Sequence, residues 1–181
     1  MKFSLDALNK SLTNARKCKN LIVGFSGGVD SRVLLHGVLL LSQKGSLKSH
    51  IKAIHINHGI NQSCNEWELF CARICSDYKI NLEIKILTGF HKLSEGINEE
   101  LLRKERYRVF NSSLDSDSGL LLAHHKDDQL ETLLLRLNRG AGVRGLAGIP
   151  ESRPLGKGII YRPLLKFDRQ SIEDFAKSEG L

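Results

Sequence analysis

Short apolar runs alternate with longer amphipathic segments along most of the chain. The runs that fit strands are apolar or alternate in polarity, and they lie at residues 21–25, 51–56, 81–87 and 119–123. The segments with apolar residues at helical spacing lie at residues 4–16, 30–42, 63–78, 98–114 and 127–137. Strands that alternate with helices of this length form right-handed βαβ units. The pattern therefore predicts an α/β fold, a doubly wound parallel sheet with helices on both faces, in one domain spanning residues 1–181.

The chain after the fourth strand carries two further patterns. The helix expected at residues 127–137 has leucines that share one side, and we expect these to face the core: Leu130, Leu133, Leu134 and Leu137. Residues 139–154 contain four glycines, two prolines and three arginines, a composition typical of a long loop. Its arginines favour a contact with an anion.

The first predicted strand ends in an abrupt turn with the sequence SGGVDS, residues 26–31. Small residues at such a turn let the backbone approach a ligand closely, and the helix that follows points its first amide groups at a bound anion. The lysine of a Walker-type loop is absent. The turn therefore predicts a phosphate site that does not serve γ-phosphoryl transfer.

Three carboxylates lie close together at the start of the last predicted helix. Asp127 and Glu131 are four residues apart, and Asp128 and Glu131 are three apart, so all three lie near one another on a helix. Like charges in this arrangement repel, although a helix amino terminus offsets part of the cost. We expect a cation there, either Mg²⁺ shared with nucleotide phosphates or an ammonium group of a substrate. A solvated acidic first turn is the alternative.

Four histidines stand at the ends of predicted strands, namely His55, His58, His124 and His125. A zinc site that includes Asp128 is one interpretation, but a closed zinc site normally has tighter spacing and thiolates. Histidines that form hydrogen bonds near a nucleotide are the favoured interpretation. Trp67 and Tyr78 are expected to pack on a helix face.

The net charge is +7, and much of the excess lies in the last third of the chain. This charge favours a polyanionic partner such as a nucleic acid, with a solvated basic face as the alternative. Four irregularly spaced cysteines do not indicate a disulfide framework. The longest apolar stretch is about half of what a membrane crossing needs, and the first residues lack the pattern of a secretory signal, so we expect a cytoplasmic protein without membrane contact.

Four segments together resemble a known family. SGGVDS at residues 26–31 is similar to the pyrophosphatase loop of the N-type ATP pyrophosphatases, the PP-loop superfamily, which cleave ATP between the α- and β-phosphates. Further similarity lies in HINHG at 55–59, NEELLRKERY at 98–107 and AHHKDDQLETLLLRLNRGAGVRGLAGI at 123–149. These blocks resemble the tRNA(Ile)-lysidine synthetases, and the resemblance implies the adenine nucleotide alpha-hydrolase-like fold of PP-loop ATPases.

The resemblance also implies a reaction and its partners. ATP adenylates the C2 oxygen of the wobble cytidine in tRNA(Ile) with anticodon CAU, and pyrophosphate is released. The ε-amine of free L-lysine then displaces AMP and leaves lysidine. Mg²⁺ is the expected metal, and a homodimer is left open.

The roles implied by the resemblance fall on named residues of this chain. The ATP-binding residues are expected to be Ser26, Gly27, Gly28, Val29, Asp30, Ser31, His58 and His124. The catalytic residues are expected to be Asp30, Asp127, Asp128 and Glu131, of which Asp30, Asp127 and Asp128 would bind Mg²⁺. Contacts with tRNA are expected from Arg103, Arg106, Arg139 and Arg144.

The chain departs from the family pattern at two points. Asn57 stands where the family usually has histidine, and the chain stops at Leu181, where members normally continue into further helices and tRNA-binding domains. We therefore expect a catalytic domain without its carboxy-terminal region. The alternatives are a tRNA thiolase or another base-adenylating PP-loop enzyme, an amidating relative such as NAD or GMP synthetase, and a non-catalytic ATP-binding module.

Overall fold

The computed structural model describes residues 1–59, 63–87, 99–140 and 147–181. Within these ranges the chain forms a six-stranded sheet in the order β3-β2-β1-β4-β6-β5. The strands are β1 (Asn20–Gly24), β2 (His50–Asn57), β3 (Leu82–Ile86), β4 (Ser118–Leu121), β5 (Ser152–Leu155) and β6 (Gly158–Tyr161). All neighbouring pairs are parallel except β5 and β6. The predicted α/β class and doubly wound, mainly parallel sheet are confirmed.

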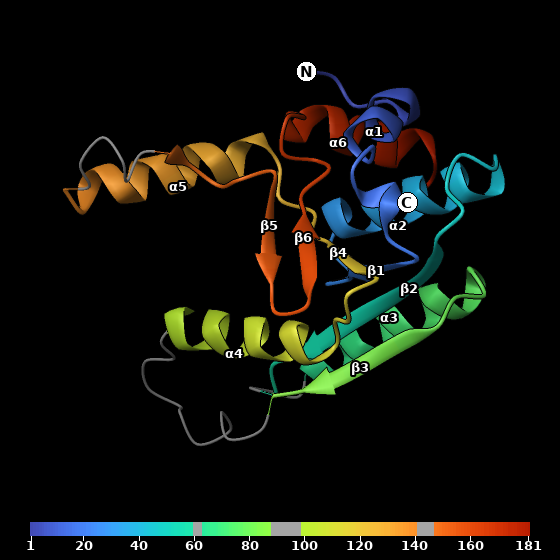
Figure 1. Ribbon diagram of the computed structural model, residues 1–181, viewed down its shortest axis with the longest axis horizontal. Coiled ribbons are helices and arrows are strands. Elements are labelled where there is room, and N and C mark those ends of the chain that lie inside the picture. The colour runs from blue at the N-terminus through green and yellow to red at the C-terminus, as the bar shows by residue number, and fades with distance from the viewer. Residues whose placement is uncertain (60–62, 88–98, 141–146) are drawn as a thin grey trace.

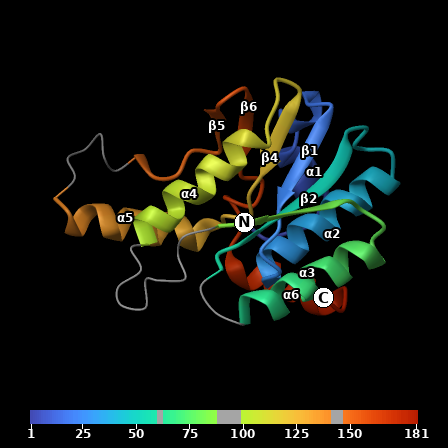
Figure 2. The same ribbon diagram turned by 90° about the horizontal axis from the view of Figure 1, so that it is seen from below.

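Helices cover both faces of this sheet (Figure 1). They are α1 (Leu5–Ser11), α2 (Val29–Gln43), α3 (Ser63–Asp77), α4 (Glu99–Ser112), α5 (Lys126–Asn138) and α6 (Arg169–Ser178), with a 3₁₀ helix η1 (Ala15–Lys17). Figure 2 shows α2, α3 and α6 together on one side, and α4 on the other. No helix in the described part of the chain combines the length and the apolarity that a membrane crossing requires.

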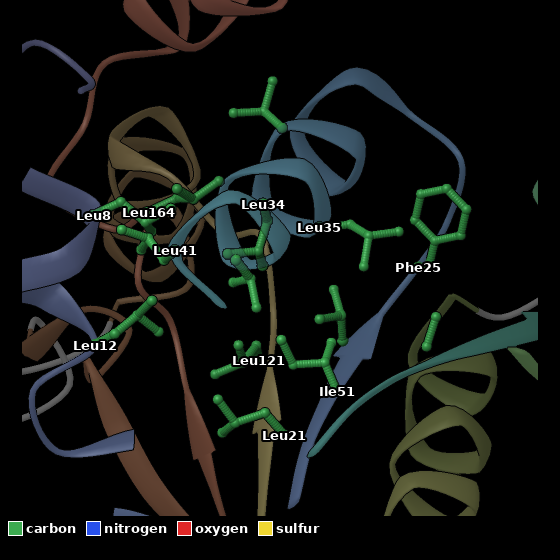
Figure 3. Packing of buried hydrophobic residues seen from close by; sticks show 14 of the residues in the cluster. Leu8, Leu12, Leu21, Phe25, Leu34, Leu35, Leu41, Ile51, Leu121 and Leu164 are labelled. Atoms are coloured by element: carbon green, nitrogen blue, oxygen red, sulfur yellow. The ribbon is translucent and has the colours of Figure 1, made fainter. Parts of the chain in front are cut away.

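The two-residue period of the central strands divides the core into two clusters. Leu21 and Val23 pack with α1, α2 and α6 on one face, whereas Ile22 packs with α4 on the other. Figure 3 shows the first cluster, in which Leu34 and Leu35 of α2 lie over the sheet. Because β1 is covered on both faces, its carboxyl end is held rigidly where the loop at residues 26–31 begins.

The prediction that the leucines of α5 face the core is wrong. Leu130, Leu134 and Leu137 are 59%, 52% and 54% exposed, and no residue of α5 is buried. The helix extends away from the sheet, as Figure 1 shows. Polar contacts hold it, from the Gln129 side chain to the backbone of Ile149 at 2.6 and 2.7 Å and from Arg136 Nη1 to the Gly148 carbonyl oxygen at 3.2 Å.

Two predictions of element boundaries also need correction. The helix expected at residues 4–16 ends at Ser11, and η1 follows it. The long loop expected at 139–154 includes the start of β5, which pairs with β6 as an antiparallel hairpin, although residues 141–146 lie outside the described ranges. Arg162 directly follows β6 beside the carboxyl end of β4, and Arg153 pairs with Ile160 on the edge strand β5.

Candidate active site

A pocket with a cavity volume of about 260 Å³ opens at the carboxyl ends of β1, β2 and β4. Parallel α/β sheets bind their ligands at this edge. Its floor is apolar, with Ile54, Ile56, Phe110 and Leu122, and its rim carries the loop at residues 26–31 together with histidine, arginine and aspartate side chains. An apolar floor below a polar rim suits a nucleoside with attached phosphates.

The loop presents the amino terminus of α2 to this pocket. Gly28 is the N-cap of α2 and has no side chain to satisfy the first amide groups of the helix. Ser31 is buried, and its hydroxyl donates a 2.9 Å hydrogen bond to the Gly28 carbonyl oxygen. The Ser26 hydroxyl lies 3.1 Å from the Ser31 oxygen. Ser31 therefore shapes the loop and accepts the hydrogen bond from the Ser26 hydroxyl, while the first amides of α2 remain available to an anion.

Helix α3 supports the loop from behind. The Trp67 indole N–H donates a hydrogen bond to the Ser26 carbonyl oxygen, and the Trp67 ring stacks on Phe70 at 5.0 Å. Gly27 has a φ of 82°, and a Cβ there would lie 2.9 Å from the Cys71 sulfur. Trp67 was expected only to pack on a helix face, but it is 47% exposed and contacts the loop directly.

Asn57 ties the end of β2 to α3. Its buried side-chain amide donates a 2.7 Å hydrogen bond to the Glu68 carboxylate, and its carbonyl oxygen accepts one of 2.8 Å from the Gly59 amide. His55 is also buried, with its Nδ1 2.8 Å from the Phe25 carbonyl oxygen. Asn57 and His55 therefore stabilise the strand ends beneath the pocket.

Two carboxylates flank a buried histidine at the mouth of the loop. The His125 Nε2 lies 3.7 Å from Asp30, and its Nδ1 lies 3.6 Å from Asp128. His125 caps α5, because its Nδ1 accepts from the Asp127 amide while Asp128 accepts a 2.7 Å hydrogen bond from the His125 amide. This capping places Nε2 as the protonated nitrogen on the Asp30 side.

Asp30 is partly buried beside His125. Burial raises the pKa of Asp30, and the interaction with the His125 imidazole opposes that rise. Its Oδ1 atom is buried and has no hydrogen-bond partner among the described residues. Such an unsatisfied oxygen beside a second carboxylate is suited to a cation.

The expected cluster of three carboxylates on α5 is divided in the structure. Asp128 lines the pocket, whereas Asp127 and Glu131 are exposed and do not line it. The charge of Asp127 lies close enough to Arg169 to contribute to its raised pKa, after the larger contributions of Glu173 and Asp30. Only Asp30 and Asp128, of the four expected catalytic residues, therefore meet at the pocket.

Two neutral histidines complete the rim. Burial, followed by the charge of Arg162, lowers the pKa of His124 to about 4. Burial, followed by the charge of Arg106, lowers the pKa of His58. Both Nδ1 atoms are buried and have no hydrogen-bond partner in the described part of the chain. Within that part no three His, Cys, Asp or Glu side chains form a metal-binding group, so the zinc interpretation gains no support.

The expected arginines are spread over different places. Arg106 lines the pocket, and Arg103 lies over the Tyr107 ring of the same helix. Arg139 is exposed at the C-cap of α5, far from the first turn of that helix. Arg144 lies outside the described residues.

Residues 3–181 match the PP-loop domain family. The chain belongs to this family. Curated relatives named tRNA(Ile)-lysidine synthase are similar to it: the one from Coxiella burnetii is 39% identical over 99% of this chain and 39% of its own length. The one from Pseudomonas syringae pv. tomato is 40% identical over 96% of this chain and 38% of its own length. The PP-loop chain thus spans about two fifths of the curated relatives it matches.

Solved structures share the fold of this PP-loop domain. The U34-tRNA thiolase NcsA from Methanococcus maripaludis superposes with a TM-score of 0.75 at 19% identity, over 98% of this chain and 62% of that chain. The NH3-dependent NAD synthetase from Campylobacter jejuni superposes with a TM-score of 0.53 at 21% identity, over 98% of this chain and 70% of that chain. Identities this low show the fold alone.

Several contacts around the PP loop were missed from the sequence. His125 links Asp30 and Asp128, Trp67 binds the loop backbone, and Arg162 is buried beside His124. The signal for His125 was present, because it precedes an acidic first turn at the position of an N-cap. Trp67 and Arg162 carried no local signal, since their partners lie far away in the sequence.

Proposed function

We propose that this PP-loop domain ligates free L-lysine to C2 of the wobble cytidine in tRNA(Ile) with anticodon CAU. ATP adenylates the C2 oxygen and pyrophosphate leaves. The lysine ε-amine attacks C2, the C2–oxygen bond breaks, and AMP departs with that oxygen. The observation that carries the proposal is the uncapped amino terminus of α2, which includes Asp30, beside His125 and Asp128 in one pocket.

The PP loop suits release of pyrophosphate. The amides at the start of α2 and the Ser26 hydroxyl would hold the β- and γ-phosphates, which leaves the α-phosphate at the pocket rim for attack by the base. The adenosine would lie over Ile54, Ile56 and Phe110, with the unpaired Nδ1 atoms of the neutral histidines as hydrogen-bond partners.

Mg²⁺ fits two of the three carboxylates expected to bind it. Asp30 and Asp128 flank His125, and the buried Oδ1 of Asp30 lacks a partner among the described residues. Mg²⁺ is commonly bound by one or two carboxylates together with substrate phosphates, and it supplies charge neutralisation when bound. Asp127 is exposed outside the pocket and fits this role less well.

The lysine substrate needs a carboxylate that binds its ammonium group and a group that takes its proton. An amine with a pKa of about 10.4 is not a nucleophile while it is charged. Asp128 and Glu131 lie one helical turn apart on α5, so together they can hold the ammonium at the pocket mouth. Asp128, which lines the pocket, would accept the proton. Arg103, Arg106, Arg139 and Arg144 would contact tRNA phosphates.

The test is an incubation of the chain with Mg²⁺, ATP labelled at the α-phosphate and unmodified tRNA(Ile) of anticodon CAU, with and without lysine. We expect AMP release that requires both tRNA and lysine, and a tRNA mass gain of one lysine less one water. Asp30→Asn should abolish both, while Asp77→Asn, an exposed matched change on α3, should alter neither. Formation of ADP, or AMP release without any lysine-dependent gain in tRNA mass, would contradict the proposal.

A thiolase reaction has less support in the described residues. Burial raises the pKa of Cys71 to about 12 and that of Cys75 to about 11, so both thiols are protonated and poor nucleophiles. Neither thiol lines the pocket.

A further inference from the structure

Three arginines converge on the Tyr107 side chain, outside the lining of the pocket, and the charges of Arg103 and Arg162 reach His124 at its rim. The Arg153 guanidinium carbon lies 4.8 Å from the Tyr107 ring centroid, and that of Arg103 lies 5.9 Å from it. The Arg162 Nη2 lies 3.5 Å from the Tyr107 hydroxyl. Arg103 comes from α4, whereas the other two come from the β5–β6 hairpin and its end. We call Arg103, Arg153 and Arg162 around Tyr107 the arginine cluster.

Positive charge in the arginine cluster is not neutralised by the described part of the protein. Arg162 is only 4% exposed, its Nη1 donates a 2.8 Å hydrogen bond to the Pro150 carbonyl oxygen, and its Nε has no partner among the described residues. Burial lowers the pKa of Arg162, the hydrogen bond to Tyr107 opposes that shift, and the charges of Arg153 and Arg103 add to it. A buried cation without a counter-charge is costly, so the cluster favours an anion from outside.

Other arginines of the chain form ion pairs with carboxylates. Arg108 forms a 2.7 Å ion pair with Glu105, and Arg169 forms one of 2.9 Å with Glu173. Among the side chains that the structure describes, in residues 1–59, 64–87, 100–140 and 147–181, no carboxylate forms an ion pair with a member of the arginine cluster. The difference indicates that the cluster is kept free for a ligand.

The cluster adjoins the nucleotide pocket but is separate from the PP loop. Arg162 directly follows β6, the loop follows β1, and β4 lies between them in the sheet. Two strand spacings place these ends about 10 Å apart. His124, at the pocket rim beyond β4, has its pKa lowered by burial and then by the charges of Arg162 and Arg103. An anion at the cluster is therefore not a phosphate held by the loop.

We propose that the arginine cluster binds a backbone phosphate of the RNA next to the base that enters the pocket. This inference rests on the proposed function and deepens it, because it assigns Arg153 and Arg162 to the RNA. A planar guanidinium binds a phosphate through two parallel hydrogen bonds. Such a contact fixes the register of the strand without reading its sequence. Tyr107 holds the guanidinium groups in position through its ring and hydroxyl.

The test measures binding of tRNA(Ile) to the full chain by filter retention between about 50 and 200 mM NaCl, without ATP. Arg153→Gln should weaken binding roughly tenfold and reduce the slope of log K against log salt by about 0.7 to 0.9. Arg153→Lys should keep the slope and lose part of the affinity. Lys157→Gln, an exposed change of equal charge at the turn of the same hairpin, should leave binding within about twofold.

A second variant tests whether the weaker binding comes from distortion of the hairpin. Arg103→Gln lies on α4, and an effect of similar size from this separate element would support a shared phosphate. ATP affinity, measured by calorimetry, should not change in either variant. Equal losses in Arg153→Gln and Lys157→Gln would overturn the inference, because they would indicate a general basic face.

The outcomes separate this inference from the proposed function. Selective weakening by Arg153→Gln in a chain that releases no AMP would support the phosphate site and reject the reaction. If the chain releases AMP in a lysine-dependent way but Arg153→Gln binds RNA as tightly as the unchanged chain, the reaction is supported and the phosphate site is rejected. Failure of the unchanged chain to bind RNA at about 50 mM NaCl would also reject the site.

Discussion

Gly27 is the position where a single methyl group should disturb the PP loop most. Its φ of 82° lies in the left-handed region, where a Cβ costs about 1–2 kcal/mol. The added carbon would also lie 2.9 Å from the Cys71 sulfur and 3.1 Å from the Trp67 Nε1, and overpacking of this kind costs about 1–3 kcal/mol. Gly27→Ala should therefore lower the free energy of unfolding by about 2–5 kcal/mol, from these two costs together.

Two other glycines of the chain separate these two costs. Gly45 has a similar φ of 72°, but a methyl group added there would have no atom within 4 Å, so Gly45→Ala should show the backbone cost alone. Gly28 has an ordinary negative φ and its nearest contact is Ser26 Oγ at 3.5 Å, so Gly28→Ala should cost little stability. Urea unfolding followed by circular dichroism gives all three values.

A double-mutant cycle identifies the clash itself. Cys71→Ala removes the sulfur that the new methyl group would meet, so it should cost less in the Gly27→Ala background than alone, with a coupling of about 0.5–3 kcal/mol. If Gly27→Ala costs no more than Gly45→Ala, or if the coupling is zero, then α3 does not restrain the loop as described.

Three further predictions concern the supports of the pocket. Trp67→Phe removes the indole donor to the Ser26 carbonyl oxygen and should weaken ATP binding about 2- to 12-fold in calorimetry, from a net hydrogen bond of about 0.5–1.5 kcal/mol; unchanged affinity would contradict this. The pKa of His124 is about 4 in the folded chain, so below a pH of about 6.5 the unfolded chain binds more protons than the folded chain. The free energy of unfolding should therefore fall by up to about 3 kcal/mol as the pH is lowered from about 6.5 to 4. His124→Gln should flatten that dependence in urea melts, and an equal slope would reject the assignment. Asn57→Ala loses the bond to the Glu68 carboxylate and should cost about 1.5–3 kcal/mol in the same melts, unlike the exposed change Asn14→Ala.

The sheet and the PP loop were predictable because their signals are local. The strand at residues 21–25, the small residues after it and the helix that follows are adjacent in the sequence, and the structure has β1 and α2 within one residue of the predicted limits. The order of strands and helices up to α5 also agrees with the prediction. Short-range patterns decide such elements because backbone hydrogen bonds and burial on both faces act over a few residues.

The contacts that hold the site together were not predictable in this way. Trp67 meets Ser26 across 41 positions, and Arg162 meets Tyr107 across 55. A helical period shows which residues share a face, but it does not show what that face packs against, as the exposed Leu130 and Leu134 demonstrate. Such partners are set by the topology of the sheet.

The acidic turn of α5 shows why spacing alone does not decide which carboxylates meet at the pocket. Neighbouring residues on a helix differ by about 100° in direction, so Asp127 and Asp128 cannot both enter one pocket. His125, the buried N-cap of α5, sets this direction. Its Nδ1 accepts a hydrogen bond from the Asp127 amide, and the Asp128 carboxylate accepts one from the His125 amide. This reciprocal capping turns Asp128 toward Asp30 and leaves Asp127 in solvent. His125, which is not among the residues expected to bind Mg²⁺, thus determines which carboxylates can share a cation.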